Sequence, residues 1–310
     1  MSSVLYDVPG PRAVLRNRIL GVITVLVILG AIGFVAWRMA ETGQFSAEKW
    51  YVFTFTSVWE QILGATGRTL AAFAAAAVFS LVLGFALAIG RMSDHAWVRA
   101  PFVAIVEIFR AIPVLIFMAL LFYGLPVLGI RVDSYWAVVI ALTAYNGSVL
   151  AEVLRAGVEA VPRGQREAGY AVGLRKSGVM RLILLPQAVR AMLPVIVAQL
   201  VVTLKDTALG SIITYNELLY FSRLIGQQAQ YDRPILQAGL VAAVIYITLC
   251  LILSGVAKWL EIRMRKSPRV SGARPAVAPL AHEATDTELL AAQRPGTSQA
   301  REQRRDDRGA

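Results

Sequence analysis

Two charged residues, Lys205 and Asp206, interrupt an apolar run that extends from Ala191 to Asn216. Thr207 follows them directly. Counted from Pro194 at about 1.5 Å per residue, these side chains lie roughly 17 Å into a membrane. A lone charge at that depth costs at least about 2.5 to 3.5 kcal/mol, so the two charges are expected to face a wet cavity. There they could bind the opposite charges of a zwitterionic solute, with a hydroxyl from the threonine. An ion pair that braces helices or subunits explains them equally well.

A second polar stretch, Gly164 to Pro194, carries six charged side chains between two apolar segments. Residues 165–172 are predicted to form a short helix, and Gly173 allows a turn. Residues 177–185 are predicted to form a second short helix that leads to Pro186. A helix, a turn and a helix between two membrane spans are typical of a docking element for another protein. A plain solvated loop is the alternative.

Composition places the chain among membrane proteins, because 57% of its 310 residues are hydrophobic and only 16% are charged. The net charge of +11 comes from short basic clusters beside apolar runs, which indicates membrane topology, and no nucleic-acid partner is expected. A single cysteine, Cys250, excludes an internal disulfide framework. His95 and His282 have no metal-ligand spacing, so no metal site is expected.

The predicted fold class is an all-α polytopic membrane protein with about six transmembrane helices. A bilayer core about 30 Å thick takes about 20 apolar helical residues. The first candidate could instead be a cleaved signal peptide, but Arg38 disrupts the cleavage pattern. Basic clusters fall in alternate loops, which places the polar hairpin and both termini in the cytoplasm. The candidate spans are Ile19–Trp37, Thr69–Gly90, Ala111–Ile130, Ser134–Ala151, the interrupted run ending at Asn216, and Ile235–Ala257.

The hairpin resembles the EAA loop of ABC importer permeases. The pattern of that loop is Glu-Ala-Ala, three residues, Gly, nine residues and Ile-x-Leu-Pro. This chain keeps the spacing without a gap and departs at one position, where Gly169 replaces the usual second alanine. Since glycine costs only about 1 kcal/mol against alanine in a helix, this departure does not weaken the match. The matching residues are Glu167, Ala168, Gly169, Gly173, Ile183, Leu185 and Pro186.

Three further segments are similar to permeases of the polar amino acid uptake family, and in particular to glutamate permease subunits. They are "FRAIPVL" from Phe109, "AYNGSVLAEVLRAGVEAVPRGQREA" from Ala144 and "LKDTALGSII" from Leu204. This resemblance implies a type I ABC importer permease fold in a bacterial cytoplasmic membrane. It also implies a cytoplasmic ATPase dimer, an extracytoplasmic solute-binding protein, a second permease subunit that is similar or identical, and an amino acid substrate.

The chain itself is expected to be a transport subunit and not an enzyme, because it contains no G-x-x-x-x-G-K-[ST] phosphate loop. It is therefore expected to bind no cofactor, and ATP and magnesium belong to the partner ATPase. The residues that would couple the chain to that ATPase are Arg163, Gly164, Glu167, Ala168, Gly169, Gly173, Ile183, Leu185 and Pro186. An ion-coupled secondary amino acid transporter is the alternative function.

Under this interpretation the domain boundaries follow the composition. Residues 1–18 form a cytoplasmic N-terminus, 19–40 an added transmembrane helix, and 60–266 the core permease domain with its EAA loop at 155–190. Residues 267–310 are expected to be a disordered cytoplasmic tail.

The predicted substrate path contains Lys205, Asp206, Thr207 and Arg110. Arg110 is also expected to pair with Glu107, three residues earlier on one helix, and this ion pair is favoured over a substrate contact. The same spacing predicts a pair between Glu152 and Arg155.

Overall fold

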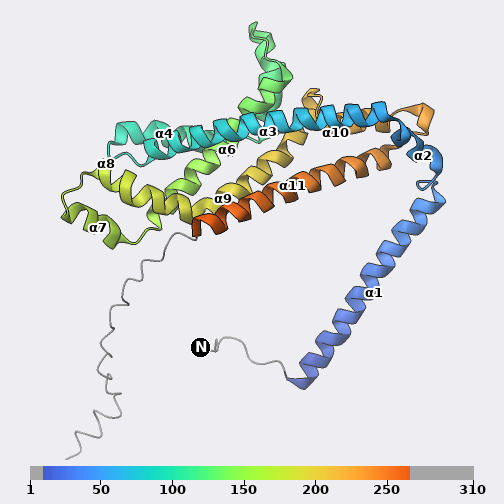
Figure 1. Ribbon diagram of the computed structural model, residues 1–310, viewed down its shortest axis with the longest axis horizontal. Helices are drawn as coiled ribbons and strands as arrows, with labels where there is room; N and C mark the ends of the chain where they lie inside the picture. Colours follow the sequence, from blue (N-terminus) through green and yellow to red (C-terminus); the bar gives the residue numbers. More distant parts are fainter. Residues whose placement is uncertain (1–9, 266–310) are drawn as a thin grey trace, which may run out of the picture. The chain divides into compact units, whose positions relative to one another are not determined.

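The computed structural model describes residues 10–265, so the first half of the predicted N-terminal segment and the predicted tail lie outside the described residues. Every regular element within them is helical (Figure 1). The elements in order are α1 (Pro11–Glu41), α2 (Ala47–Tyr51), η1 (Val52–Thr54), α3 (Thr56–Arg91), α4 (Ala96–Ala111), α5 (Val114–Ala119), η2 (Leu120–Gly124), η3 (Leu125–Leu128), α6 (Ser134–Glu159), α7 (Arg163–Ala171), α8 (Lys176–Gly178), η4 (Val179–Leu184), α9 (Leu185–Asp206), η5 (Thr207–Ile213), α10 (Leu218–Gly226), η6 (Ala229–Tyr231) and α11 (Ile235–Arg265).

Five helical stretches in the described part of the chain are long and apolar enough to cross a membrane. They are α1, α3, α6, the run Lys176–Ile213, and α11 as far as Leu260. A sixth span results if α4 and the segment Val114–Leu128 count as one broken crossing. The all-α polytopic prediction with about six spans is therefore confirmed. The first span, α1, buries none of its side chains.

The third predicted span, Ala111–Ile130, contains the helical segment Val114–Leu128, and its first residues form a sharp bend that was not predicted. The chain bends by 95° between α4 and Val114–Leu128. Ile112 adopts an extended conformation (φ −80°, ψ 123°) between the two helices. The residue before a proline is forced away from the helical region, and Pro113 follows here. The break thus has a local cause in the sequence.

The fifth span also differs from the prediction. A helix was expected to end at Pro186 and a separate span to begin near Ala191, but the helical path runs without interruption from Lys176 to Ile213. Pro186 lies inside this path and lacks the backbone N–H that a continuous α-helix would bond, and it directly follows a turn of irregular helical geometry. The preceding η4 is a wider, π-helical turn that joins α8 to α9.

Small residues bring α3 and α6 close together in the centre of the bundle. A Cβ atom added to Gly84 would lie 2.8 Å from Cβ of Leu150 and 3.0 Å from the carbonyl oxygen of Gly147. Ala72 and Ala76 on α3 are fully buried against α6 in the same way. Such residues let backbones approach closely, which is how helices associate in lipid. Figure 1 shows α3 and α6 side by side, with α9 packed against α6.

Two further clusters pack near opposite ends of α3. One packs α10 and the first turns of α11 against α3, through Leu218, Phe221, Ile225, Ala238 and Ala242. The other supports the polar hairpin and consists of Val158, Val161, Val179, Leu184 and Ala188. The hairpin is therefore anchored to the ends of α6 and α9.

Candidate functional site: the polar hairpin and the charged residues of the fifth span

The first arm of the hairpin is α7, and it ends in a Schellman motif. The N–H of Gly173 donates to the carbonyl of Tyr170 at 2.9 Å, and the N–H of Leu174 donates to the carbonyl of Gly169 at 3.1 Å. Gly173 has a φ of +83°, in the left-handed region that glycine adopts without strain. Leu174 then packs against the cluster that supports the hairpin. The predicted short helix and its glycine turn are present.

One face of α7 packs against the second arm through Gly169, which is buried. A Cβ atom at this position would lie 2.8 Å from Cδ1 of Ile183 and 2.9 Å from Cγ2 of Val179. Glycine at this position was expected to leave the contact surface of the helix nearly unchanged, and this expectation needs correction. Glycine allows a closer approach between the two arms than alanine would.

The predicted coupling residues separate into two groups. Those on the outer surface of α7 are exposed, whereas Gly169 is buried and Ile183 half-buried between the two arms. Leu185 is half-buried in the second arm, on the side that faces α3 and α4. Pro186 is exposed at the start of α9, and Gly173 forms the turn. The outer group can contact a partner, and the inner group sets the position of α7. The exposed residues of the outer group are Arg163, Gly164, Glu167 and Ala168.

The predicted substrate-path residues lie where α9 changes into η5. Lys205 is exposed and Asp206 is half-buried, and Thr207, the first residue of η5, is fully buried. Within residues 10–265 no oppositely charged side chain lies within 4.0 Å of Lys205 or Asp206. The brace between helices that was one explanation for these charges is therefore absent from the described part of this chain. A solute or a second subunit remains as their partner.

Arg110 lies apart from that junction, at the end of α4, and its closest acidic neighbour is Glu107 at 3.9 Å. Glu107 also approaches Arg91 on α3, at 3.4 Å, and Arg91 lies 3.1 Å from Glu152 on α6. Arg155 pairs with Glu152, as the spacing predicted. An ion-pair cluster thus ties together the ends of α3, α4 and α6 beside the hairpin, and Arg110 belongs to it.

A buried carboxylate at the opposite end of the bundle was missed by the sequence reasoning. Glu217 is fully buried, and it caps α10 by accepting the backbone N–H groups of Leu219 and Tyr220 at 2.8 and 2.7 Å. The hydroxyl of Tyr246 on α11 donates to the same carboxylate at 2.5 Å. Burial raises the pKa of Glu217, and the three hydrogen bonds oppose that shift. The signal in the sequence was weak, because glutamate is not among the preferred helix caps.

A hydroxyl group ties this cap to α3. Thr69 on α3 accepts the backbone N–H of Leu218, the residue after Glu217, at 3.1 Å. The hydroxyl of Thr207, next to Asp206, donates to the carbonyl of Leu204 at 2.7 Å. In the part of the chain that the structure describes, no group of three or more His, Cys, Asp or Glu side chains is arranged to hold a metal ion.

Residues 80–266, which include the hairpin and the fifth span, match the model of the family described as "Binding-protein-dependent transport system inner membrane component". The chain belongs to this family. The fold of the chain is similar to that of a solved importer, entitled "Crystal structure of an amino acid ABC transporter with histidines". The two match with a TM-score of 0.62 and 26% sequence identity, and the match covers 68% of this chain and 97% of that one.

Curated relatives of this family are similar over most of their length. The glutamate transport system permease protein GluD of Corynebacterium glutamicum is 40% identical over 231 residues, which cover 73% of this chain and 84% of the relative. The arginine transport system permease protein ArtQ of Bacillus subtilis is 31% identical over 212 residues, or 66% of this chain and 93% of the relative. The chain is thus a multi-pass membrane permease of the ABC importer type, and its relatives differ in the amino acid that they are named for.

Proposed function

We propose that this chain is the permease subunit of an ATP-driven importer for a polar amino acid, and that the amino acid is glutamate. The observation that carries the proposal is the construction of the hairpin. It presents an exposed helical face, with Glu167 at its centre, on a helix that is locked to the start of the fifth span through Gly169. The glutamate assignment is supported by the 40% identity to a glutamate permease.

The mechanism follows from how this helix is joined to the span. A cytoplasmic ATPase dimer that holds ATP and magnesium would contact Arg163, Gly164, Glu167 and Ala168. Because the second arm and the fifth span form one helical path of 38 residues, from Lys176 to Ile213, a displacement of α7 moves the span without an intervening loop. This motion would open or close the proposed substrate path at Lys205 and Asp206.

The two unpartnered charges in that span are the proposed substrate contacts. Lys205 would meet an acidic group of the amino acid, and Asp206 would meet its amino group, with Thr207 held nearby by its hydrogen bond to the carbonyl of Leu204 at 2.7 Å. We place the hairpin and both termini in the cytoplasm, as the distribution of basic loops predicts. The proposed complex is completed by a second permease subunit and an extracytoplasmic solute-binding protein.

Reconstitution into proteoliposomes tests this function. The chain is combined with a candidate ATPase and a candidate binding protein from the same organism, and uptake of labelled glutamate is measured with ATP on the side of the membrane that exposes the hairpin. Unlabelled glutamate is expected to compete more strongly than glutamine, arginine or histidine. A photo-crosslinker placed at position 167 is expected to capture the ATPase.

The outcomes separate the alternatives. Uptake that persists without the ATPase, and that follows an ion gradient, would favour an ion-coupled secondary transporter. ATP-dependent uptake in which arginine or glutamine competes best would keep the importer and reject glutamate as its substrate.

A further inference from the structure

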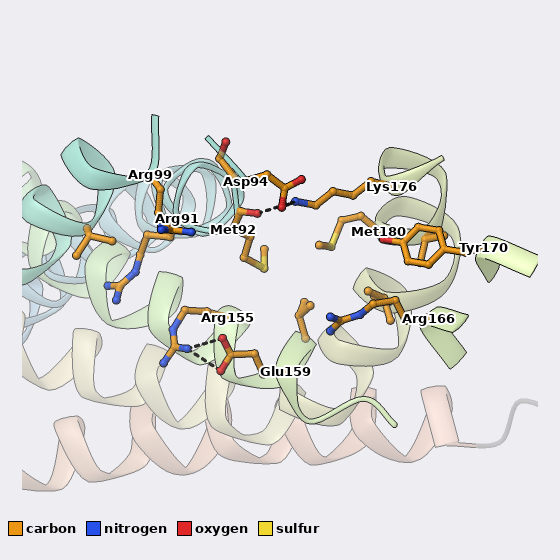
Figure 2. A pocket seen from close by; sticks show the side chains of 15 residues that line it. Arg91, Met92, Asp94, Arg99, Arg155, Glu159, Arg166, Tyr170, Lys176 and Met180 are labelled. Atoms are coloured by element: carbon orange, nitrogen blue, oxygen red, sulfur yellow. Dashed lines mark hydrogen bonds and ion pairs between the residues drawn. The ribbon is translucent and has the colours of Figure 1, made fainter. Parts of the chain in front are cut away.

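A cation-lined hollow of about 650 Å³ lies beneath the hairpin, between the turn from α3 to α4, the end of α6 and the two arms. Figure 2 shows basic side chains reaching this space from each of these elements. Five basic side chains line the hollow, against two acidic ones, Asp94 and Glu159. The basic residues are Arg91, Arg99, Arg155, Arg166 and Lys176.

Part of this positive charge is not neutralised by the protein. Lys176 pairs with Asp94, and Arg155 pairs with Glu159 at 2.6 Å. For Arg99 and Arg166, by contrast, no acidic side chain within residues 10–265 lies closer than 4.0 Å.

Arg91, by contrast, is already matched by the protein. Its guanidinium lies 3.4 Å from Glu107 and 3.1 Å from Glu152, and its side chain is only 10% exposed. The unmatched positive charge of the hollow therefore comes from Arg99 and Arg166, and a planar guanidinium suits a phosphate group.

An apolar groove of about 750 Å³ adjoins this hollow, and the two share Met92, Asp94, Lys176 and Met180. The groove is walled by apolar side chains of α3, α4 and the second arm, and its rim carries basic residues of the second arm. Arg175 and Arg181 on this rim also have no acidic partner within 4.0 Å in the described chain. The apolar wall includes Ala86, Ile89, Phe102 and Leu185.

The position of the groove along the helices matches the edge of a membrane. α3 ends at Arg91, and Ile89, one turn or less before that end, is 59% exposed. Trp97 at the start of α4 is 78% exposed, and tryptophan is enriched where the bilayer meets water. A molecule in the groove would therefore place an apolar part on the lipid side and a charged part at the interface.

We propose that this paired site binds an anionic glycerophospholipid. Its phosphate lies against the cationic hollow and the basic rim, and one acyl chain lies in the groove. An acyl chain gains little by leaving other lipid tails for the groove, so the preference among lipids comes from the headgroup charge. The bound lipid joins the turn between α3 and α4 to the second arm of the hairpin, alongside the Lys176–Asp94 pair.

Native mass spectrometry of the full-length protein in detergent tests the site with phosphatidylglycerol and phosphatidylcholine of the same acyl chains. Phosphatidylglycerol is expected to bind about tenfold more tightly. The double variant Arg175→Ala/Arg181→Ala is expected to lose most of that preference. The matched control, Arg131→Ala/Arg233→Ala, removes two arginines from loops at the other end of the spans and is expected to keep it.

A second variant covers the case in which the double variant does not fold. Ser177→Glu adds a negative charge at an exposed position on the rim of the groove, and it is expected to weaken phosphatidylglycerol binding and leave phosphatidylcholine unchanged. Equal binding of the two lipids by the wild-type protein would overturn the proposal. Water-soluble glycerol phosphate that displaces the lipid at equal concentration would also overturn the proposal, because the ligand of the site would then be a free phosphate compound. Loss of lipid binding when the ATPase is bound would also overturn it, since a protein surface would then fill the hollow.

Discussion

Gly173 tests whether the geometry of the hairpin turn controls docking of the ATPase. Its φ of +83° is costly for a residue with a side chain, by about 1 to 2 kcal/mol, and a Cβ atom there would meet nothing within 4 Å. The penalty of a substitution should therefore follow conformational preference and not size. Asparagine tolerates this region better than alanine although it is larger, and valine tolerates it worst.

The magnitude follows from the length of the helix. α7 has nine residues and depends on its contacts for stability, because isolated helices of that length are marginal. A cost of about 1 to 2 kcal/mol lowers the ratio of correctly formed to distorted hairpin about 5- to 30-fold. Since apparent affinity scales with the competent fraction, Gly173→Ala is expected to weaken ATPase binding by up to that factor.

The assay is titration of the purified chain, in nanodiscs, with the ATPase and no nucleotide. Binding is expected to weaken in the order asparagine, alanine, valine at position 173. Gly178→Ala is the control in the same hairpin, because its added Cβ would make an ordinary contact of 3.5 Å with Leu174, and it should bind like the wild type. The reasoning is refuted if asparagine is more damaging than alanine, or if the control loses as much affinity as Gly173→Ala.

Three other substitutions test the core, the path and the buried carboxylate. Gly84→Leu should force α3 away from α6 and destabilise the protein by about 1 to 3 kcal/mol. The thermal midpoint in detergent should fall, and an unchanged midpoint would contradict this close packing. Asp206→Ala should abolish uptake without loss of ATPase binding, and wild-type transport would place the substrate elsewhere. Because the pKa of Glu217 is raised above its ordinary 4.5, its protonated form stabilises the fold; this contribution is full below pH 4.5 and is lost as pH rises through the folded pKa. The thermal midpoint of the wild type should therefore fall as pH rises through this range, and it should fall less in Glu217→Gln. An equal fall in the variant would show that another group causes the pH dependence.

Local sequence signals predicted the features that depend on neighbouring residues. Gly173 marked the turn, and the spacing of Glu107 and Arg110 marked their ion pair. Each of these is decided by backbone preference or by one helical turn. The break at Ile112 also had a local signal in Pro113, but the continuous apolar run concealed it.

Features that depend on distant residues were not predictable in this way. The carboxylate of Glu217 is held by Tyr246, which lies 29 positions later on another helix, and no periodicity joins the two. The tight packing of Gly169 depends on Val179 and Ile183 across the hairpin. From the sequence, glycine at position 169 in place of the alanine of the EAA pattern therefore looked neutral. Its role is visible only from the packing of the second arm.

The first helix, α1, has a different relation to the chain from that of the others. It buries none of its own side chains, so the described core is complete without it. Within the described residues, exchanging one apolar side chain of α1 for another therefore requires no compensating change in the bundle. This makes α1 a practical point at which to attach a tag or to exchange one membrane anchor for another.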